Sequence, residues 1–188
     1  MSEVNIIKDV SLIIPCQNAE KKLLQLLRSI QNWEAIPNEI IIIDSSSEKF
    51  LLPEDLKLFT ERLNIKSLVI YGDNLYPGHA RNIGVVNATN STLAFLDTST
   101  HPNKRWLSSG LNLMHANNSQ GVWGYTYYQA DYYMPKIIRA CTFGARPIKT
   151  FPGSILGKNV FDRCGLFIES TRAGEDGDWM SRVDFHKI

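Results

Sequence analysis

Residues 10–44 read VSLIIPCQNAEKKLLQLLRSIQNWEAIPNEIIIID, and this stretch decides the fold class. It holds two short apolar runs, at 10–14 and 40–43, which stop at Pro15 and Asp44. Runs of this kind are typical of strands that are buried on both faces of a sheet. Two such strands close together in the chain favour parallel pairing, provided that a helix connects them.

The residues between the two runs follow helical spacing. Leu23, Leu27 and Ile30 recur on one face of a helix, and Asn18 stands ahead of them as the predicted N-cap. This part of the chain therefore predicts a strand, a helix and a second, parallel strand.

The same alternation continues to about residue 116. We expect three more helices, at 53–63, 77–88 and 106–114, and two more strands, at 67–71 and 92–96. Right-handed crossovers would bring the carboxyl ends of all four strands to one edge of a mostly parallel sheet. Ligands of open α/β sheets bind at that edge, so the crevice should gather Pro15, Asp44, Gly72, Asp73 and Asp97.

The alternation fails after residue 120. Gly121 to Tyr128 is predicted as a strand, and the stretch from there to Phe151 is aromatic, basic and interrupted by proline. We interpret this stretch as a lid or an acceptor-binding surface. The tyrosines at 125–128 and 132–133 are expected to pack against a neighbouring strand rather than to stack on sugar rings.

Composition and charge exclude several classes of protein. The 188 residues carry 20 Lys and Arg against 19 Asp and Glu, so no global positive field is available for nucleic acid. The 3 cysteines show no CxxC spacing, which argues against a disulfide framework and a zinc site.

We find no pattern typical of a targeting signal or a membrane span in this sequence. The N-terminal residues lack the regions of a signal peptide, and the longest aliphatic run, Ile40 to Ile43, is too short to cross a bilayer. We therefore expect a cytoplasmic protein with no transmembrane segment in this chain. Association with a membrane would then depend on a partner or on a missing segment.

Two acidic sites are the candidates for chemistry. Asp97 closes the apolar run 92–96, and Glu175 and Asp176 open a cluster near the C-terminus. A carboxylate at the end of a buried strand lies where a ligand binds, and a second carboxylate could act on that ligand. Together they indicate transfer chemistry on a charged donor. Each site also has a purely structural explanation, because acids are common in turns and at helix N-termini.

Five motifs follow one another along the chain. They are Pro-x-x-Asn at 15–18, Asp-x-x-Ser at 44–47, Ala-Arg-Asn-x-Gly at 80–84, Asp-x-Ser at 97–99 and Glu-Asp at 175–176. In this order and spacing the chain resembles the family 2 glycosyltransferases of the GT-A fold, over nearly all of its length.

The resemblance implies an α/β, Rossmann-like nucleotide-diphospho-sugar transferase fold with a mostly parallel central sheet flanked by helices. A single domain would span 1–188, with a nucleotide-binding half at about 1–116 and an acceptor-binding half at about 120–188. The implied activity is the inverting transfer of a sugar from a nucleotide-diphosphate donor to a hydroxyl. A UDP-sugar is the favoured donor, and a saccharide or a lipid-linked molecule is the expected acceptor.

The resemblance also assigns roles in catalysis. Family members usually use Mg²⁺ or Mn²⁺ to offset the charge of the diphosphate leaving group, and Asp97 and Ser99 match the metal-binding motif. Asp176 matches the family's catalytic base. Glu175 would position the acceptor or the base.

Donor-binding residues carry over from the earlier motifs. Pro15 and Asn18 would shape the base pocket, and Asp44 or Ser45 would contact the nucleoside. Arg81 would face the base or a phosphate.

Three departures from the family pattern weaken parts of this assignment. Ser99 replaces the second Asp of Asp-x-Asp, the usual direct metal ligand, and a hydroxyl brings no formal charge to a metal. Ser45 stands where many members have a second acid, which loosens the choice of uridine. The chain ends shortly after Asp176, where relatives commonly continue, and this is compatible with a C-terminal truncation.

Two other functions stay open on the sequence. A degenerate, non-catalytic GT-A-like module would bind nucleotide-sugar without turnover, as Ser99 suggests. A nucleotidyltransferase would also hold a metal with an Asp in a nucleotide crevice. Such enzymes usually carry a Gly-rich, basic loop after the first strand, and Cys16 to Glu20 is not such a loop.

Overall fold

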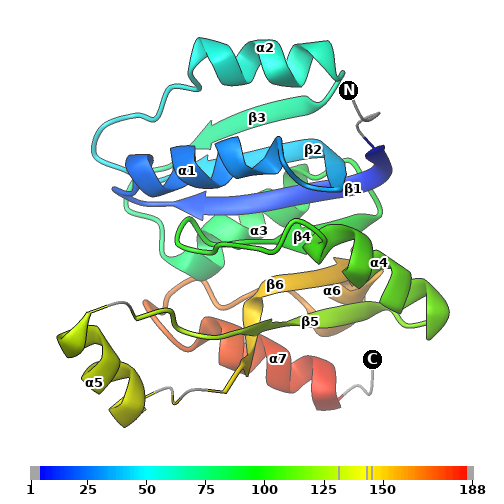
Figure 1. The fold of residues 1–188 in the computed structure, drawn as a ribbon. Coiled ribbons are helices and arrows are strands. Elements are labelled where there is room, and N and C mark those ends of the chain that lie inside the picture. Colours follow the sequence, from blue (N-terminus) through cyan, green and yellow to red (C-terminus); the bar gives the residue numbers. More distant parts are fainter. Residues whose placement is uncertain (1–4, 131, 143, 145, 186–188) are drawn as a thin grey trace.

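In the computed structural model of the protein, residues 5–130, 132–142, 144 and 146–185 are described, and they form a six-stranded sheet flanked by helices (Figure 1). The strands are β1 Asn5–Cys16, β2 Ala35–Asp44, β3 Lys66–Tyr71, β4 Thr92–Phe95, β5 Gly121–Thr126 and β6 Ile148–Gly157. The helices are α1 Glu20–Ile30, α2 Glu54–Arg62, α3 Pro77–Asn87, α4 Trp106–Ala116, α5 Tyr133–Thr142, α6 Asn159–Cys164 and α7 Glu175–Phe185.

The strand order confirms the predicted α/β class. The sheet runs β3-β2-β1-β4-β6-β5, with parallel pairing from β3 through β4 and antiparallel pairing of β6 with both its neighbours. The chain first builds outward from β1 to β3 and then returns to place β4 on the other side of β1. Open α/β sheets bind ligands at the carboxyl ends of the two central strands, where the strand order reverses.

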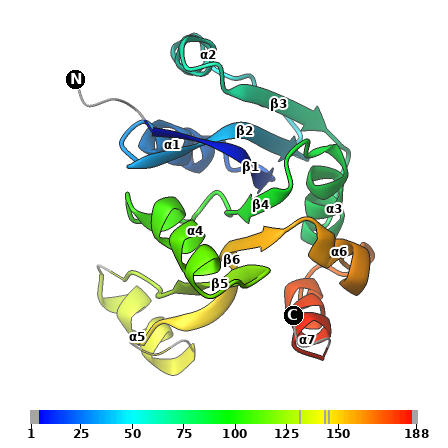
Figure 2. The ribbon, with the colours of Figure 1, turned by 90° about the vertical axis from the view of Figure 1, so that its right-hand side faces the viewer.

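Alternate residues of the central strands feed two separate cores. Leu12, Ile14 and Ile40 belong to the core under α1, α2 and α4, whereas Ile13 and Ile41 belong to the core under α3, α6 and α7. Figure 2 shows these two helical layers on opposite faces of the sheet. The uninterrupted apolar runs of the sequence follow from this arrangement, because both faces of β1 and β2 are covered.

A glycine allows α3 to lie close to the sheet. A Cβ added at Gly84 would come within 2.4 Å of Cγ2 of Ile13 and 3.0 Å of Cδ1 of Ile43. The close packing of α3 against the sheet therefore requires the glycine of the Ala-Arg-Asn-x-Gly motif. The same packing fixes the position of Arg81, which lies one turn earlier on α3.

Asn18 does not cap α1, so this part of the prediction is wrong. The N-cap residue is Ala19, which has no side chain able to cap, and Asn18 has a positive φ of 49°. Its side-chain oxygen instead accepts hydrogen bonds from the amide and the hydroxyl of Ser47. Asn tolerates this left-handed conformation better than most residues, and here it joins two loops rather than starting a helix.

The stretch between β5 and Phe151 is more regular than the sequence suggested. It contains α5 and the first part of β6, and β6 fills the gap between β4 and β5. The prediction that the tyrosines of this stretch pack against a strand is wrong. Tyr125, Tyr127, Tyr132 and Tyr133 have exposed fractions of 65% to 79%.

A buried carboxylate ties the amino-terminal part of the sheet together. Glu39 on β2 is 1% exposed. It accepts hydrogen bonds from the hydroxyl of Ser11 and from the amide and hydroxyl of Thr89, and Nζ of Lys66 lies 2.6 Å away. Burial alone would raise the pKa of Glu39, but these donors outweigh it and hold the pKa below its ordinary value of 4.5.

Because the folded-state pKa of Glu39 is below the unfolded-state value, its ionised form stabilises the fold at neutral pH, and this contribution is lost as the pH falls through the folded-state value. We expect Glu39→Gln to lower the free energy of unfolding at neutral pH by about 2 kcal/mol, since a hydrogen-bonded buried charge is lost. Below the ordinary pKa of 4.5 the difference between the unfolding free energies of the variant and the wild type should become smaller. Urea unfolding as a function of pH measures both effects. Glu61→Gln, at an exposed position of α2, is the control, and an equal response of the two variants would contradict this role of Glu39.

Candidate active site

Arg81 on α3 joins the two acidic sites. Its Nη1 lies 2.7 Å from Oε1 of Glu175, and its Nη2 lies 3.1 Å from Oδ1 of Asp97. These three residues come from α3, from the loop after β4 and from the start of α7. We call them the Arg81 triad.

Arg81 is buried among aromatic side chains. Its side chain is 5% exposed, and its guanidinium lies 5.3 Å from the ring centre of Phe151 and 5.8 Å from that of Phe167. Burial by itself would lower the pKa of Arg81, but the charges of Asp97 and Glu175 outweigh it and raise the pKa above the ordinary value. The guanidinium therefore stays charged, and its fork geometry suits two separate carboxylates.

Asp97 divides its carboxylate between protein and solvent. Its side chain is 37% exposed, and only Oδ1 contacts Arg81. Within the described part of the chain, Oδ2 makes no hydrogen bond. The backbone of Asp97 closes a turn with Thr100, which orients the carboxylate at the end of β4. Oδ2 of Asp97 is therefore available to a ligand at the end of the strand.

The start of α7 carries one buried and one accessible acid. Glu175 is 4% exposed and faces Arg81, whereas Asp176 is partly exposed and accepts a hydrogen bond from the amide of Gly177. Trp179, one turn further on, stacks against Phe161 and Phe167 in the core. The buried residues therefore anchor the helix and leave the carboxylate of Asp176 toward solvent.

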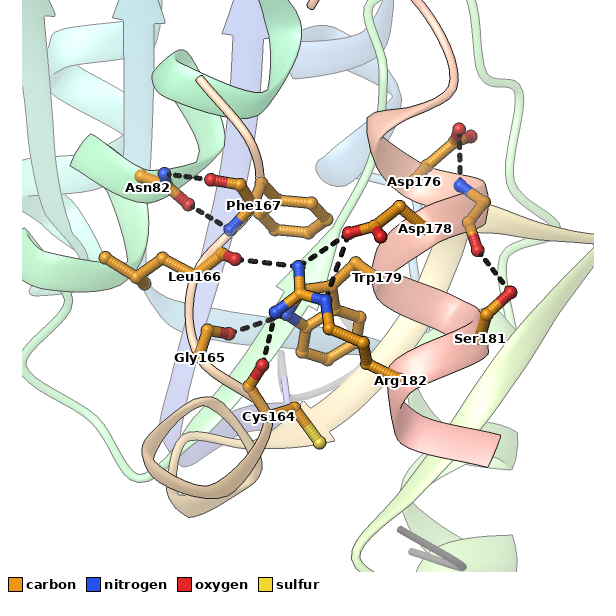
Figure 3. Close-up of polar contacts among 11 residues, drawn as sticks. Asn82, Cys164, Gly165, Leu166, Phe167, Asp176, Asp178, Trp179, Ser181 and Arg182 are labelled. Carbon is orange, nitrogen blue, oxygen red and sulfur yellow. Dashed lines mark hydrogen bonds and ion pairs between the residues drawn. The ribbon is translucent and has the colours of Figure 1, made fainter. Parts of the chain in front are cut away.

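A second set of contacts, not anticipated from the sequence, fixes the segment before α7 (Figure 3). Arg182 donates to the carbonyls of Cys164 and Leu166 and pairs with Asp178 at 2.9 Å. Asn82 on α3 donates to the carbonyl of Phe167 and accepts from its amide. The helical spacing of Asp178 and Arg182 was the only signal of this arrangement in the sequence.

The loops after β1 and β2 are joined to each other. Asn18 receives two hydrogen bonds from Ser47 and donates its own amide to the hydroxyl of Ser46. The two carboxylate oxygens of Asp44, which is 2% exposed, accept from the amides of Ser46 and Phe50.

The structure thus places the predicted residues in two groups at one edge of the sheet. Arg81, Asp97, Glu175 and Asp176 form the first, and Pro15, Asn18, Asp44 and Ser45 lie at the neighbouring ends of β1 and β2. Ser99 is exposed in the loop beyond Asp97.

The oxygen donors near Asp97 could hold a metal ion only together with a ligand. Among the described residues, no group of three or more His, Cys, Asp or Glu side chains is placed to hold a metal. The available protein oxygens are Oδ2 of Asp97 and the exposed hydroxyl of Ser99. Mg²⁺ is commonly bound by one or two carboxylates together with substrate phosphates, and this donor set suits such a site rather than a closed protein cage.

Comparison with solved structures places the architecture among the GT-A glycosyltransferases. The crystal structure of Staphylococcus aureus TarS 1-349 in complex with UDP-GlcNAc matches with a TM-score of 0.65 and 21% identity, over 93% of this chain and 52% of that one. A mannosyltransferase, PcManGT from Pyrobaculum calidifontis, in complex with GDP-Man and Mn²⁺, matches with a TM-score of 0.61 and 15% identity, over 90% of this chain and 50% of that one. At these identities the likeness establishes the fold.

The family model of Glycosyl transferase family 2 matches residues 11–168. The chain therefore belongs to glycosyl transferase family 2, and the resemblance seen in its motifs is confirmed.

Curated relatives agree with this membership. A glycosyltransferase of Rickettsia felis, itself uncharacterized, is 27% identical over 179 residues, which are 89% of this chain and 29% of the relative. The poly(ribitol-phosphate) beta-N-acetylglucosaminyltransferase TarS of S. aureus is 25% identical over 111 residues, or 58% of this chain and 19% of the relative. The chain spans less than a third of the length of either relative.

Removing the cation of the Arg81 triad should destabilise the fold. We expect Arg81→Met to lower the free energy of unfolding by about 3–5 kcal/mol, because Glu175 would keep a buried charge without its partner. Arg81→Met combined with Glu175→Gln should recover part of this loss. Urea unfolding of the single and double variants measures the coupling.

Arg28→Met serves as the control, because Arg28 pairs with Asp55 where both side chains are more than half exposed. Its effect should stay within about 0.5 kcal/mol. Additive effects of the Arg81 and Glu175 substitutions would show that the two residues do not depend on each other.

Proposed function

We propose that this chain transfers a sugar from a nucleotide-diphosphate donor to a hydroxyl acceptor with inversion, and that Asp176 is the general base. The observation that carries the proposal is the bridge that Arg81 forms between Asp97 and Glu175. This bridge holds the loop after β4, where the donor would bind, against α7, which carries the proposed base. The two solved relatives contain UDP-GlcNAc and GDP-Man, which supports a nucleotide-sugar as the donor class.

The nucleoside would lie over the joined loops that follow β1 and β2. Pro15 and Asn18 would form one wall of its pocket, and Ser45 would be a near neighbour. Asp44 would act indirectly, since both of its oxygens already accept main-chain hydrogen bonds and keep the loop 45–50 in shape.

The diphosphate would reach the crevice at Asp97. Oδ2 of Asp97 and the hydroxyl of Ser99 would hold Mg²⁺ or Mn²⁺ together with phosphate oxygens. A bound metal would offset the charge that develops on the leaving diphosphate. Lys104 would not take part, because its carbonyl accepts from the amide of Glu34 and its Nζ lies 3.7 Å from the Glu34 carboxylate, just before the amino-terminal end of β2.

Asp176 would accept the proton of the attacking hydroxyl. The acceptor oxygen forms a bond to the anomeric carbon as the bond from that carbon to the phosphate oxygen breaks, and the electron pair leaves with the diphosphate. The proton passes to the carboxylate of Asp176, which is partly exposed beside the buried Glu175. Attack from the side opposite the leaving group inverts the configuration.

Glu175 and Arg81 would be positioning residues in this mechanism. Glu175 is occupied by Arg81 and buried, so its role is to fix the first turn of α7 and with it the direction of Asp176. Arg81 holds Oδ1 of Asp97 and leaves Oδ2 for the metal. This assignment differs from the expectation that Arg81 faces the base or a phosphate, because its side chain is 5% exposed.

A degenerate module that binds donor without transferring it is the alternative, and the replacement of an acid by Ser99 is the observation that motivates it. It has the weaker support, because Asp97, Glu175 and Asp176 are all present and Asp176 is accessible. If the chain bound the donor but released no nucleotide with any acceptor, this would favour the non-catalytic module.

Substitution of the base should separate binding from chemistry. We expect Asp176→Asn to slow transfer by roughly 10²- to 10⁴-fold, the usual contribution of general-base catalysis, and to leave the dissociation constant of the donor nearly unchanged. Nucleotide release from UDP-GlcNAc and from GDP-mannose, with a panel of saccharide acceptors, measures transfer. Asp162→Asn, at an exposed acid of α6, is the control. Full activity of the Asp176 variant would remove Asp176 from the mechanism.

Restoring the second acid should strengthen metal-dependent binding. We expect Ser99→Asp to tighten nucleotide binding in the presence of Mn²⁺ by at least about tenfold, because the site gains a charged oxygen ligand. Ser99→Ala should weaken it slightly. Calorimetric titration with and without Mn²⁺ gives both numbers, and an unchanged Mn²⁺ dependence in both variants would place Ser99 outside the metal shell.

A further inference from the structure

The helix α5 and the residues before it expose an unusual amount of apolar surface. More than half of the large hydrophobic side chains that are exposed in the described structure fall between residues 125 and 148. We define the α5 surface by six of them, whose exposed fractions run from 40% to 79%: Tyr127, Tyr132, Tyr133, Met134, Ile137 and Ile138.

The apolar residues of α5 lie on one side of the helix. Tyr133 and Ile137 are one turn apart, as are Met134 and Ile138, and Lys136 stands on the other side. Helices with such an apolar face normally bury it, and a short helix gains most of its stability from that packing. Every residue from 132 to 138 is exposed, so the described part of the fold leaves this face in solvent. A patch of this kind marks an interaction site.

Charge indicates the kind of partner. Between residues 121 and 157 the only acid in the sequence is Asp131, whereas the basic residues are Lys136, Arg139, Arg146 and Lys149. Lys149 pairs with Asp184, and the half-buried Arg139 donates to the carbonyl of Tyr128, whereas Lys136 and Arg146 are exposed. The chain as a whole is balanced at 20 basic and 19 acidic residues, so this positive charge is local.

We propose that the α5 surface docks on an anionic membrane surface. Tyrosines and aliphatic side chains suit the boundary between headgroups and acyl chains, and Lys and Arg suit anionic headgroups. The helix would lie in the plane of the membrane. In the part of the chain that the structure describes, no helix is long and apolar enough to cross a bilayer. A second copy of the chain fits less well, because two such surfaces would bring like charges together.

The position of α5 gives this docking a direction. β5 runs antiparallel to β6, and β6 runs antiparallel to β4, so the carboxyl end of β5 lies on the same edge as the crevice. In Figure 1, α5 lies beyond that end of β5, on the side to which β1 points. Docking through α5 would therefore hold the crevice at the membrane surface. The proposal itself does not depend on transfer activity.

Vesicle co-sedimentation of the full chain tests the proposal. We expect binding to phosphatidylcholine vesicles that contain phosphatidylglycerol, little binding to pure phosphatidylcholine, and release at high salt. Ile137→Glu with Ile138→Glu, and separately Lys136→Glu with Arg146→Glu, should each lower the partition coefficient at least about tenfold, since each basic residue near an anionic surface contributes a several-fold factor. Thermal unfolding checks that the variants fold.

Matched controls lie on α2. Leu58→Glu changes a residue that is 57% exposed, and Lys57→Glu changes its basic neighbour, so both should bind vesicles like the wild type. Equal binding to neutral and anionic vesicles, absence of binding, or wild-type binding by the α5 variants would overturn the proposal. Dimers in sedimentation velocity that the α5 substitutions dissociate, without vesicle binding, would identify a second copy as the partner instead.

Discussion

A buried positive charge between two carboxylates is the constraint on which the site depends. Removing the Arg81 guanidinium from water is costly, and the fold compensates with Glu175 at 2.7 Å and Asp97 at 3.1 Å. The two carboxylates would repel each other without it. Because the three residues belong to α3, to the end of β4 and to α7, the site can form only when these elements are all in place. Folding and assembly of the site are therefore coupled.

The topology explains why this charge lies where chemistry can use it. The strand order reverses between β1 and β4, which is where open α/β sheets bind ligands, and the close packing of Gly84 against Ile13 holds α3 against the sheet there. Phe151 and Phe167 close the far side of the guanidinium, where the low dielectric strengthens its ion pairs. Oδ2 of Asp97 makes no hydrogen bond among the described residues and Asp176 is partly exposed, and these are the two groups that the proposed transfer requires.

The sequence predicted most of the first half of the fold and less of the second. The strands and helices up to α4 could be predicted because β1 and β2 are apolar on both faces and because the apolar residues of the helices recur at helical spacing. β6 was missed since Pro152 and Gly153, with φ at 93°, interrupt its pattern, and α5 was missed because its apolar face covers no core. The five motifs contain the candidate site residues. Their partners were not visible, because Arg81 and Glu175 are 94 positions apart and only the fold brings them together.

We propose that the carboxyl end of β4, beside the Arg81 triad, binds a nucleoside diphosphate through Asp97. Thermal unfolding with UDP, GDP, CDP and dTDP, each with and without Mn²⁺, tests it most directly, on the wild type and on Asp97→Asn. A ligand at 100 times its dissociation constant should stabilise the fold by roughly 2.7 kcal/mol. We expect a clear rise in the melting temperature with one of these nucleotides, which depends on Mn²⁺ and is lost in Asp97→Asn. No rise with any nucleotide, or an equal rise in Asp97→Asn, would contradict it.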